Sequence, residues 1–188
     1  MPNAAPTAGD FSISSIEGIN FALTYTPYDQ TVVPSATNSV DNPGPPYQLG
    51  THALGTDGTE YIFCKASAAV VQYAAVSIDK DSNVATLTLA ALRALNDYGW
   101  PQVAIASGAY GWVAVRGKGI GVLARLSSLP NVPCYISNVS AGRITTTSVR
   151  STSGGTMLNV VLTTCVTTSP SGATVANASW PGTSRIGG

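Results

Sequence analysis

Few side chains in this 188-residue chain have the types and spacing that acid–base or nucleophilic chemistry requires. The single histidine, His52, lies in the sequence Gly-Thr-His-Ala-Leu-Gly-Thr-Asp-Gly. A Ser-His-Asp site needs such a base beside an orienting acid, and Asp57 is available for that role. However, no G-x-S-x-G nucleophile turn accompanies this pair. We therefore expect His52 to lie in a turn or at the edge of a sheet.

The acidic residues do not form the patterns of a glycosidase or a calcium loop. A glycosidase needs two opposed carboxylates in a cleft, whereas most of the nine acids here lie in Pro-rich or turn-like sequence. The segment Asp79-Lys-Asp81-Ser-Asn83 begins like an EF-hand loop but continues with Val84 and has no Glu at the twelfth position. It is more typical of a hairpin turn. We predict no metal site and no cofactor.

A glycine-rich stretch, Arg116-Gly-Lys-Gly-Ile-Gly121, resembles a phosphate-binding loop only superficially. It lacks the G-x-x-x-x-G-K-[ST] spacing, and it lies between two predicted strands rather than before a helix. This context favours a β-turn or a β-bulge. With no catalytic residue to name, we do not expect the chain to be an enzyme.

The three cysteines, Cys64, Cys134 and Cys165, are an odd number without metal-binding spacing. Each has apolar or β-branched neighbours, which predicts buried free thiols. A disulfide between two of them, in an extracellular particle, is the alternative.

The composition is that of a folded protein with an unusually neutral surface. Hydrophobic residues make up 44% of the chain, charged residues only 10%, and the net charge is zero. A charge-poor surface promotes association, which suits a protein that is packed into an assembly. The charges are segregated, because residues 1–64 contain six acids and no Lys or Arg, whereas residues 98–188 contain six bases and no acid. The two halves could attract within a chain or between chains, or the segregation has no role. The bases are too dispersed to predict nucleic-acid binding.

Residues 1–49 are predicted to form an extended, Pro-rich N-terminal arm. Seven prolines between positions 2 and 46 exclude a continuous helix, and short strand-like pieces occur at 16–25 and 31–33. Such a segment either stays loose or lies along something else. The start of the chain has no apolar leader, and no stretch is long and apolar enough to span a membrane, so neither a secretory signal nor a membrane partner is predicted.

Residues 50–188 are predicted to form a β-barrel or sandwich core. Short β-rich segments are separated by turn signals about every ten residues. They cover residues 60–65, 69–78, 84–89, 103–107, 110–116, 120–126, 134–137, 143–150, 157–168 and 174–178. Residues 88–98 have apolar residues at helical spacing and end at Gly99 and Pro101, which predicts one short helix. The expected fold is all-β: a small β-barrel or jelly-roll-like sandwich with one short helix and the extended arm.

The segment 102–117, which contains Tyr110-Gly-Trp-Val, resembles a segment of virion structural proteins from tailed bacteriophages. Cys134-Tyr135-Ile136-Ser137 and Ser140-Ala141-Gly142 extend the likeness, which covers roughly residues 50–150. The resemblance implies a capsid decoration (cement) protein with a β-barrel or jelly-roll-like fold, which binds the major capsid protein on the outer surface of the phage head. It supplies no catalytic residue.

Physical reasoning about that motif places Tyr110, Trp112 and Ala114 on one face of a strand, with Gly111 and Val113 on the other. Trp112 is either a core residue, which we favour, or an interface anchor. The candidate interface residues are Pro43, Pro45, Pro46, Tyr47, Trp112 and Trp180. Self-association is also expected, with a trimer favoured.

Two other functions remain open from the sequence. A tail- or fibre-associated β module would bind host glycans through exposed aromatic residues. A cell-wall hydrolase would need a cleft with paired acids or a site centred on His52. Capsid decoration is the function that the resemblance and the neutral composition favour.

Overall fold

The computed structural model describes residues 18–26, 45–87, 97–125, 128, 131–137, 140–146, 157–162 and 173–180. Within these ranges the chain forms ten β-strands and no helix, which confirms the all-β prediction. The strands are β1 (His52–Leu54), β2 (Glu60–Ala66), β3 (Val76–Ile78), β4 (Val84–Leu87), β5 (Asp97–Pro101), β6 (Tyr110–Arg125), β7 (Pro133–Ile136), β8 (Ile144–Thr145), β9 (Met157–Leu162) and β10 (Ala173–Trp180).

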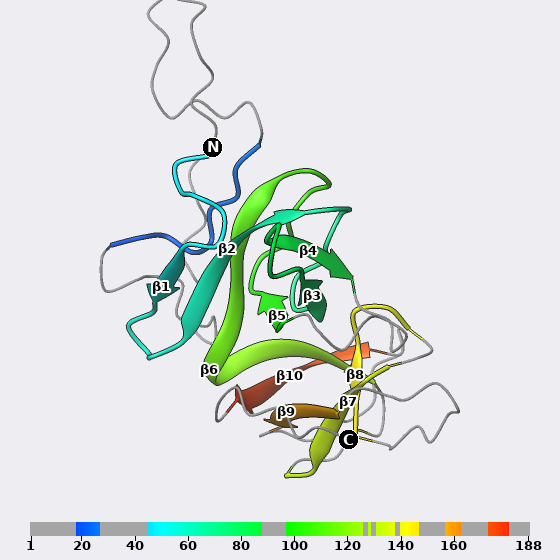
Figure 1. Cartoon of the computed structure of the whole chain (residues 1–188). Helices are drawn as coiled ribbons and strands as arrows, with labels where there is room; N and C mark the ends of the chain where they lie inside the picture. Colours follow the sequence, from blue (N-terminus) through cyan, green and yellow to red (C-terminus); the bar gives the residue numbers. More distant parts are fainter. Residues whose placement is uncertain are drawn as a thin grey trace, which may run out of the picture.

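Two closed rings of strand pairings share the long strand β6 (Figure 1). The first ring runs β2–β4–β3–β5–β6 and returns to β2, which closes a five-stranded barrel. The second runs β6–β10–β9–β7–β8 and returns to β6. β1 adds to the edge of β2 outside the first ring. Of the two architectures expected from the sequence, the barrel is therefore the one adopted.

The two rings have the same topology. In the first barrel β2 and β4 are parallel neighbours and every other pairing is antiparallel. In the second ring β6 and β8 are the parallel neighbours, and again all other pairings are antiparallel. Each strand of the first barrel thus has a counterpart four strands later. The last strand of the first unit, β6, is the first strand of the second.

The two faces of β6 serve different rings, because side chains alternate along a strand. Val113 belongs to the cluster inside the first barrel, with Ile62, Cys64 and Ile78. Trp112 and Ala114 lie on the opposite face and belong to a larger cluster. That larger cluster continues along β6 and includes the residues that fill the second ring, namely Ile120, Val122, Ala124, Cys134, Ile136, Ile144 and Leu162. The outer face of the first barrel is therefore continuous with the interior of the second ring.

An aromatic layer covers the outer face of the first barrel. Trp112 is fully buried, and its ring lies 5.1 Å from that of Phe63 and 5.3 Å from that of Phe21, centroid to centroid. Tyr47 contributes a further edge-on contact to Trp112 at 5.0 Å. Two of these four rings come from the segment assigned to the N-terminal arm. The described parts of that segment, residues 18–26 and 45–49, thus pack against the barrel core.

The predicted helix over residues 88–98 lies mostly outside the described residues, but its C-terminal end is wrong. Asp97 and Tyr98 open strand β5, which pairs with β3 and β6. Gly99, expected to stop a helix, lies inside this strand. A Cβ at Gly99 would come 2.5 Å from Val113 Cγ1 and 2.9 Å from the Ala114 carbonyl oxygen. The glycine therefore permits close packing between β5 and β6 rather than a turn.

The turn predicted at residues 116–119 is also wrong, although the bulge offered as its alternative is confirmed. The two strands expected on either side are one strand, β6, which bends sharply between the rings (Figure 1). Register shifts occur at Glu60/Tyr61 opposite β6 and again at Ala178/Ser179. Gly117 and Gly119 have positive φ angles of 146° and 71°, which a side chain would strain. They let the strand bend without leaving the ladder.

Other boundaries differ less. The segments predicted as strands at 69–78 and 103–107 contain only β3 and an isolated bridge between Val70 and Ile105. In the predicted strand at 16–25, the described residues contain the Tyr25–Tyr110 bridge instead. The hairpin turn at residues 79–83 is confirmed, with the Asp79 carboxylate accepting hydrogen bonds from the Ser82 backbone N–H and hydroxyl. The segment at 31–33 lies outside the described residues.

Two sets of buried contacts join the rings to each other. The Gln102 side chain accepts a hydrogen bond from the Gly121 N–H (3.0 Å) and donates to the Gly121 and Trp100 carbonyls. On the other side, Ala75 N–H donates to the Gly142 carbonyl, and a Cβ at Gly142 would lie 2.9 Å from Ala74 Cβ. Together with the continuous strand β6, these contacts hold the two rings against each other.

Candidate binding pocket at the mouth of the first barrel

A small cavity of about 90 Å³ opens at the end of the first barrel where β2 and β5 begin. Its apolar part is formed by Ile62, Ile78 and Val115, which belong to or pack against the cluster inside the barrel. The opposite end of the barrel interior is filled by other members of that cluster, including Ile105 and Ala109. We call the open end the mouth pocket. It is lined by His52, Glu60, Ile62, Ile78, Asp97, Tyr98, Val115 and Arg116.

The charged side chains reach the mouth because each belongs to the end of a strand or to the bend of β6. Glu60 is the first residue of β2 and is directly opposite Arg116 in the β2–β6 ladder. Asp97 is the first residue of β5 and is opposite Ile78. Inward-facing positions inside the barrel carry apolar residues, and the same faces become charged where the strands reach solvent. A charged rim around an apolar floor is the result.

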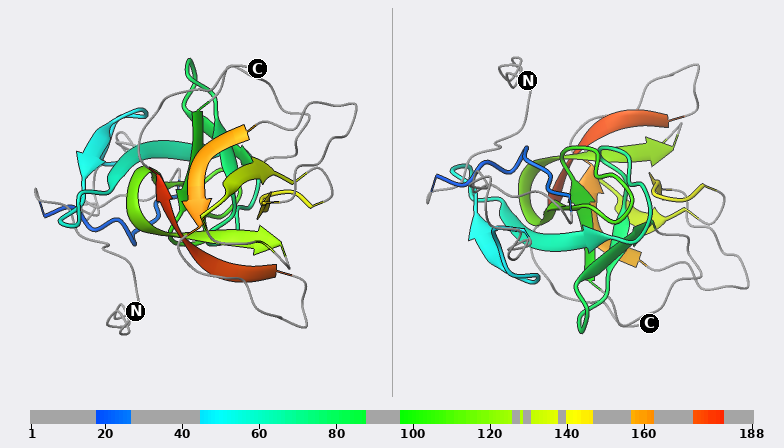
Figure 2. Two further views of the ribbon diagram at one scale, coloured as in Figure 1. Left: turned by 90° about the horizontal axis from the view of Figure 1, so that it is seen from below. Right: turned by 90° about the horizontal axis from the view of Figure 1, so that it is seen from above.

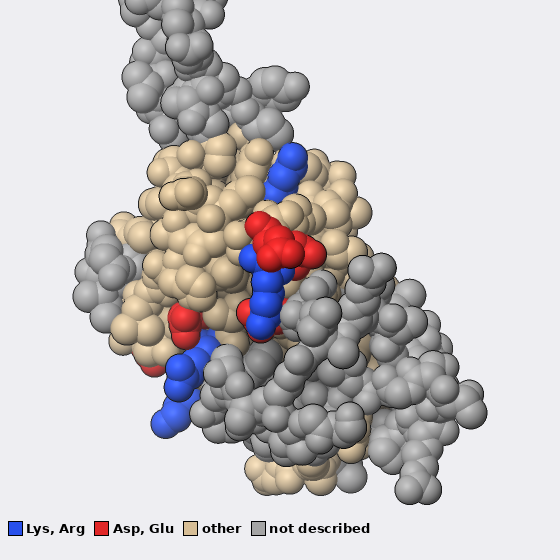
Figure 3. Space-filling view, in the orientation of Figure 1, with Lys and Arg blue, Asp and Glu red and all other residues tan. Residues whose placement is uncertain are grey.

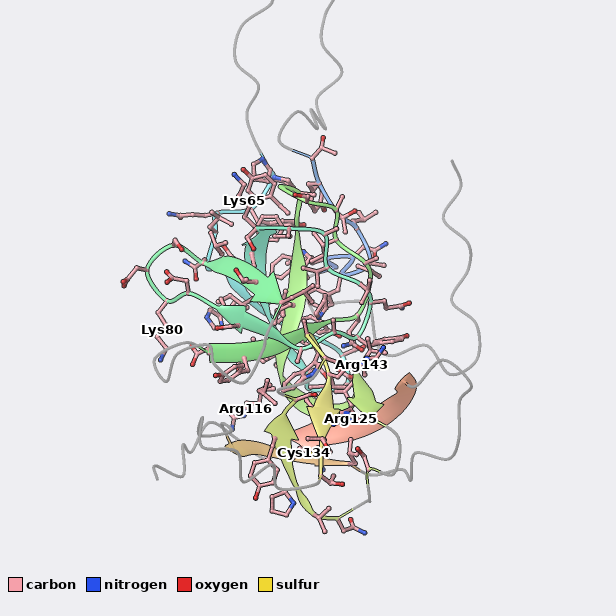
Figure 4. All side chains as sticks on the ribbon, turned by 90° about the vertical axis from the view of Figure 1, so that its right-hand side faces the viewer. Lys65, Lys80, Arg116, Arg125, Cys134 and Arg143 are labelled. Carbon is pink, nitrogen blue, oxygen red and sulfur yellow. The ribbon has the colours of Figure 1, made fainter. Side chains whose placement is uncertain are left out.

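Both carboxylates of the rim have a basic neighbour. His52 Nδ1 and Glu60 Oε1 are 2.8 Å apart, a hydrogen bond that becomes an ion pair when the imidazole is protonated. Lys80 Nζ lies 3.3 Å from Asp97 Oδ1. Arg116, in contrast, has no ion pair with any of the residues that the structure describes. Figure 4 labels Lys80 and Arg116 on the same side of the first barrel.

The pocket can bind a small group but is too small for a typical substrate site. Ligand pockets usually enclose about 300–1,000 Å³. Among the described residues, no three His, Cys, Asp or Glu side chains are grouped so that they could hold a metal ion. The arrangement therefore suits non-covalent recognition of a small apolar group that carries one charge.

The residues singled out from the sequence lie in different places. His52 belongs to the edge strand β1, as predicted for a turn or strand edge, and it also lines the mouth pocket. Trp112 is buried in the aromatic layer, which confirms the core position favoured for it.

The other candidate interface residues are only partly described. Pro45 and Tyr47 are half-buried, and Tyr47 packs beside Trp112, whereas Pro46 is exposed. Pro43 and the Trp180 side chain lie outside the described parts.

Two of the three cysteines are buried free thiols, as predicted, and Cys165 lies outside the described residues. Burial raises the pKa of Cys64, inside the first barrel, to about 12. Burial also raises the pKa of Cys134 to about 11, against a smaller lowering by a backbone hydrogen bond from Leu162. Cys134 lies within the second ring (Figure 4). Neither thiol has the lowered pKa of a reactive cysteine.

Sequence reasoning did not identify Glu60, Asp97 or Arg116 as neighbours. They lie far apart along the chain and come together only because β2, β5 and β6 pair side by side. The one available signal was that each charge directly adjoins an apolar, β-rich run.

Comparisons of the chain with protein-family models, with curated proteins and with solved structures find no match. In the described part of the chain, no helix is long and apolar enough to cross a membrane.

Proposed function

We propose that this chain is a structural protein of a bacteriophage particle, a decoration protein that binds the major capsid protein on the outside of the head. The observation that carries the proposal is a neutral surface on the double-ring body. We define this neutral face as residues 18–26, residues 45–51 and β1. It contains no Lys, Arg, Asp or Glu.

The neutral face has the properties of a protein–protein contact. Leu23 and Leu54 are 38% and 42% exposed, and Pro46 is exposed beside the half-buried Tyr47. Its segments lie on the same side of the molecule, away from β7 and β8 (Figure 2). In Figure 3 the tan surface at the upper left shows no charged side chain, a single cation lies at its upper right edge, and a band that contains both acids and bases lies below it. Neutral, apolar surface favours association over solvation.

The backbone of β1 offers a second means of attachment. β1 is the terminal strand in the sheet order, and in the described part of the chain only β2 pairs with it. An edge strand presents unpaired N–H and C=O groups on which a partner can add a strand. Many copies on a shell would turn a weak contact of this kind into a strong one. Self-association, with a trimer favoured, would use the same kind of surface.

The test is co-sedimentation of the purified chain with empty shells assembled from a candidate major capsid protein. We expect saturable binding that is weakened at least about tenfold by Leu54→Asp, because the charge would be buried unpaired at the contact. Val71→Asp is the matched control, since Val71 is 56% exposed and lies outside the neutral face. Light scattering on the same samples gives the oligomeric state.

Equal binding by the two aspartate variants would refute the neutral face as the contact. No binding by the unmodified chain would refute capsid decoration. In that case a glycan array becomes the next screen, because a tail- or fibre-associated module is the remaining virion role.

A further inference from the structure

We infer that the mouth pocket of the first barrel is a binding site for a short, branched aliphatic carboxylate. This inference does not depend on the proposed virion role. It rests on the juxtaposition of an apolar cavity, two acids that each have a basic side chain beside them, and one arginine without an ion pair among the described residues.

The cavity sets the size of the apolar part. Its volume of about 90 Å³ is smaller than the roughly 150 Å³ cavity that holds benzene in an engineered protein, so a branched alkyl group of about three or four carbons fits. The floor matches such a group, because Ile62, Ile78 and Val115 are all branched aliphatic residues. Small-ligand sites also occur commonly in the mouths of β-barrels.

The charged side chains of the rim determine the sign of the charge that a ligand should carry. Glu60 already accepts a hydrogen bond from His52, and Asp97 is 3.3 Å from Lys80, so a cationic ligand would have to displace an existing partner at either acid. Arg116 has no such partner among the described residues, and its guanidinium can hold a carboxylate through two parallel hydrogen bonds. An anion therefore gains the most from this rim.

The backbone holds the arginine at the edge of the cavity. Arg116 directly follows Val115 of the floor. Its backbone lies opposite that of Glu60 in the β2–β6 ladder. A ligand with its alkyl group against Val115 would therefore have its carboxylate within reach of the Arg116 side chain. Because Arg116 is exposed, solvent screens the attraction, and a ligand of about seven non-hydrogen atoms should have a Kd on the order of 1 mM.

Two sources share this ligand chemistry: a free small carboxylate, and the C-terminal carboxylate of a peptide that ends in an aliphatic residue. The probe for the first is isovalerate, and its neutral control is isovaleramide, which has nearly the same shape. The probes for the second are short neutral peptides ending in valine, with a free or an amidated C-terminus. A peptide acid that binds more tightly than isovalerate supports the peptide source, and equal binding supports the free carboxylate.

The experiment is a titration of the isotope-labelled full chain followed by amide chemical shifts, which also reports whether each variant is folded. We expect isovalerate to cause saturable shifts at Glu60, Ile62 and Val115. Isovaleramide and the variant Arg116→Gln should each weaken binding at least about tenfold, the value of one charge-assisted hydrogen bond. Arg116→Lys should retain part of the affinity.

The matched control is Lys118→Gln, which removes a nearby exposed cation of β6 that does not line the pocket. This variant should bind isovalerate as the unmodified chain does. Three results would overturn the inference: no saturable shift at about twenty times the expected Kd, equal affinity for acid and amide, or equal losses in Arg116→Gln and Lys118→Gln.

Discussion

The first barrel and the second ring have the same order of strands but different interiors. The first is filled by small and branched residues such as Ile62, Cys64 and Val113, and its outer face carries the aromatic layer. The second is filled by aliphatic residues such as Ile120, Ile136 and Leu162, continuous with that layer. One pairing order can therefore be reached with unrelated side chains. The two units share the alternation of apolar side chains along their strands and the types of residue in their turns, rather than particular core residues.

The turns show the shared chemistry most directly. Between β3 and β4, the Asp79 side chain accepts a hydrogen bond from the N–H of the residue three positions later, Ser82. Between β7 and β8, the Ser137 hydroxyl does the same for Ser140. Each hairpin then has a positive-φ residue, Asn83 or Gly142, within two positions of the start of the next strand. The same kind of hydrogen bond and a positive-φ residue thus occur in the corresponding hairpins of both units.

Truncation of one large core side chain in each ring should show whether the two rings unfold together. Trp112→Ala removes the centre of the aromatic layer and should lower the free energy of unfolding by about 3–5 kcal/mol. Ile136→Ala, inside the second ring, should cost about 2–5 kcal/mol. Because β6 belongs to both rings, we expect a single calorimetric transition in both variants. Two separated transitions would mean that the rings are independent units.

A pair of glycine variants should isolate the contact between the rings. Gly142 and Gly58 have similar φ angles, 72° and 81°, but only a Cβ at Gly142 would meet Ala74 and Leu87. Gly142→Ala should therefore cost about 2–5 kcal/mol, the sum of backbone strain and overpacking. Gly58→Ala should cost only the strain, about 1–2 kcal/mol. Equal losses in urea unfolding would show that the packing around Gly142 accommodates a methyl group and is not as close as the structure indicates.

Substitution of Gln102, which lies beside the bend of β6, should lower the free energy of unfolding by a somewhat smaller amount. Gln102→Ala leaves the buried N–H and C=O of Gly121 without their side-chain partner, at a cost of about 2–3 kcal/mol. Hydrogen exchange at the Gly121 amide should accelerate by about the same free energy. Gln72→Ala removes one hydrogen bond of an exposed side chain and should cost less than about 1 kcal/mol. An unchanged Gly121 exchange rate in Gln102→Ala would mean that the Gln102 side chain does not protect the Gly121 amide.

The buried thiols should make the free energy of unfolding fall at alkaline pH. This effect should be the smallest of the predicted ones. The raised pKa values of Cys64 and Cys134, about 12 and 11, lie above the ordinary thiol value, so the folded state retains protons that the unfolded state releases. Their contribution is fully present below the unfolded pKa. It is lost as pH rises toward the folded pKa, by about 1.4 kcal/mol per unit and thiol.

Urea unfolding at pH 8 and pH 10 measures this loss. Between these values Cys64→Ala should lose about 1–2 kcal/mol less than the unmodified chain, and Cys134→Ala a similar amount. Burial of Tyr61, followed by the nearby Asp57 charge, also raises the pKa of that phenol, but this contribution is common to all variants. Identical pH dependence in all three proteins would show that the thiols are not protected by folding.

Local features of this fold were predictable from the sequence where one short segment determines them. The core position favoured for Trp112 was correct, and the Asp79 hairpin followed from turn residues alone. The glycine-rich region at residues 116–121 could not be interpreted correctly in the same way, since glycines are as typical of a turn as of a bent strand. Only the pairing of β10 with the second half of β6 distinguishes the two.

The mouth pocket and the repeated topology were beyond sequence reasoning for a different reason. Arg116 and Glu60 are neighbours through the β2–β6 register, and a shift of one residue would place them on opposite faces. The repeat of ring order leaves no visible sequence period, because each ring needs only apolar residues on one face and turns at the strand ends.

The sequence by itself determined the all-β class, the neutral composition, the buried thiols and the positions of several turns, because these depend on residue type and on neighbours within a few positions. The tertiary structure decided that the strands close two rings, that Phe21 and Tyr47 complete the core of the first, and that Arg116 lies at the rim of an apolar mouth. These features depend on which distant segments pair, and that choice is made by the total burial and hydrogen bonding of the whole chain rather than by any one segment.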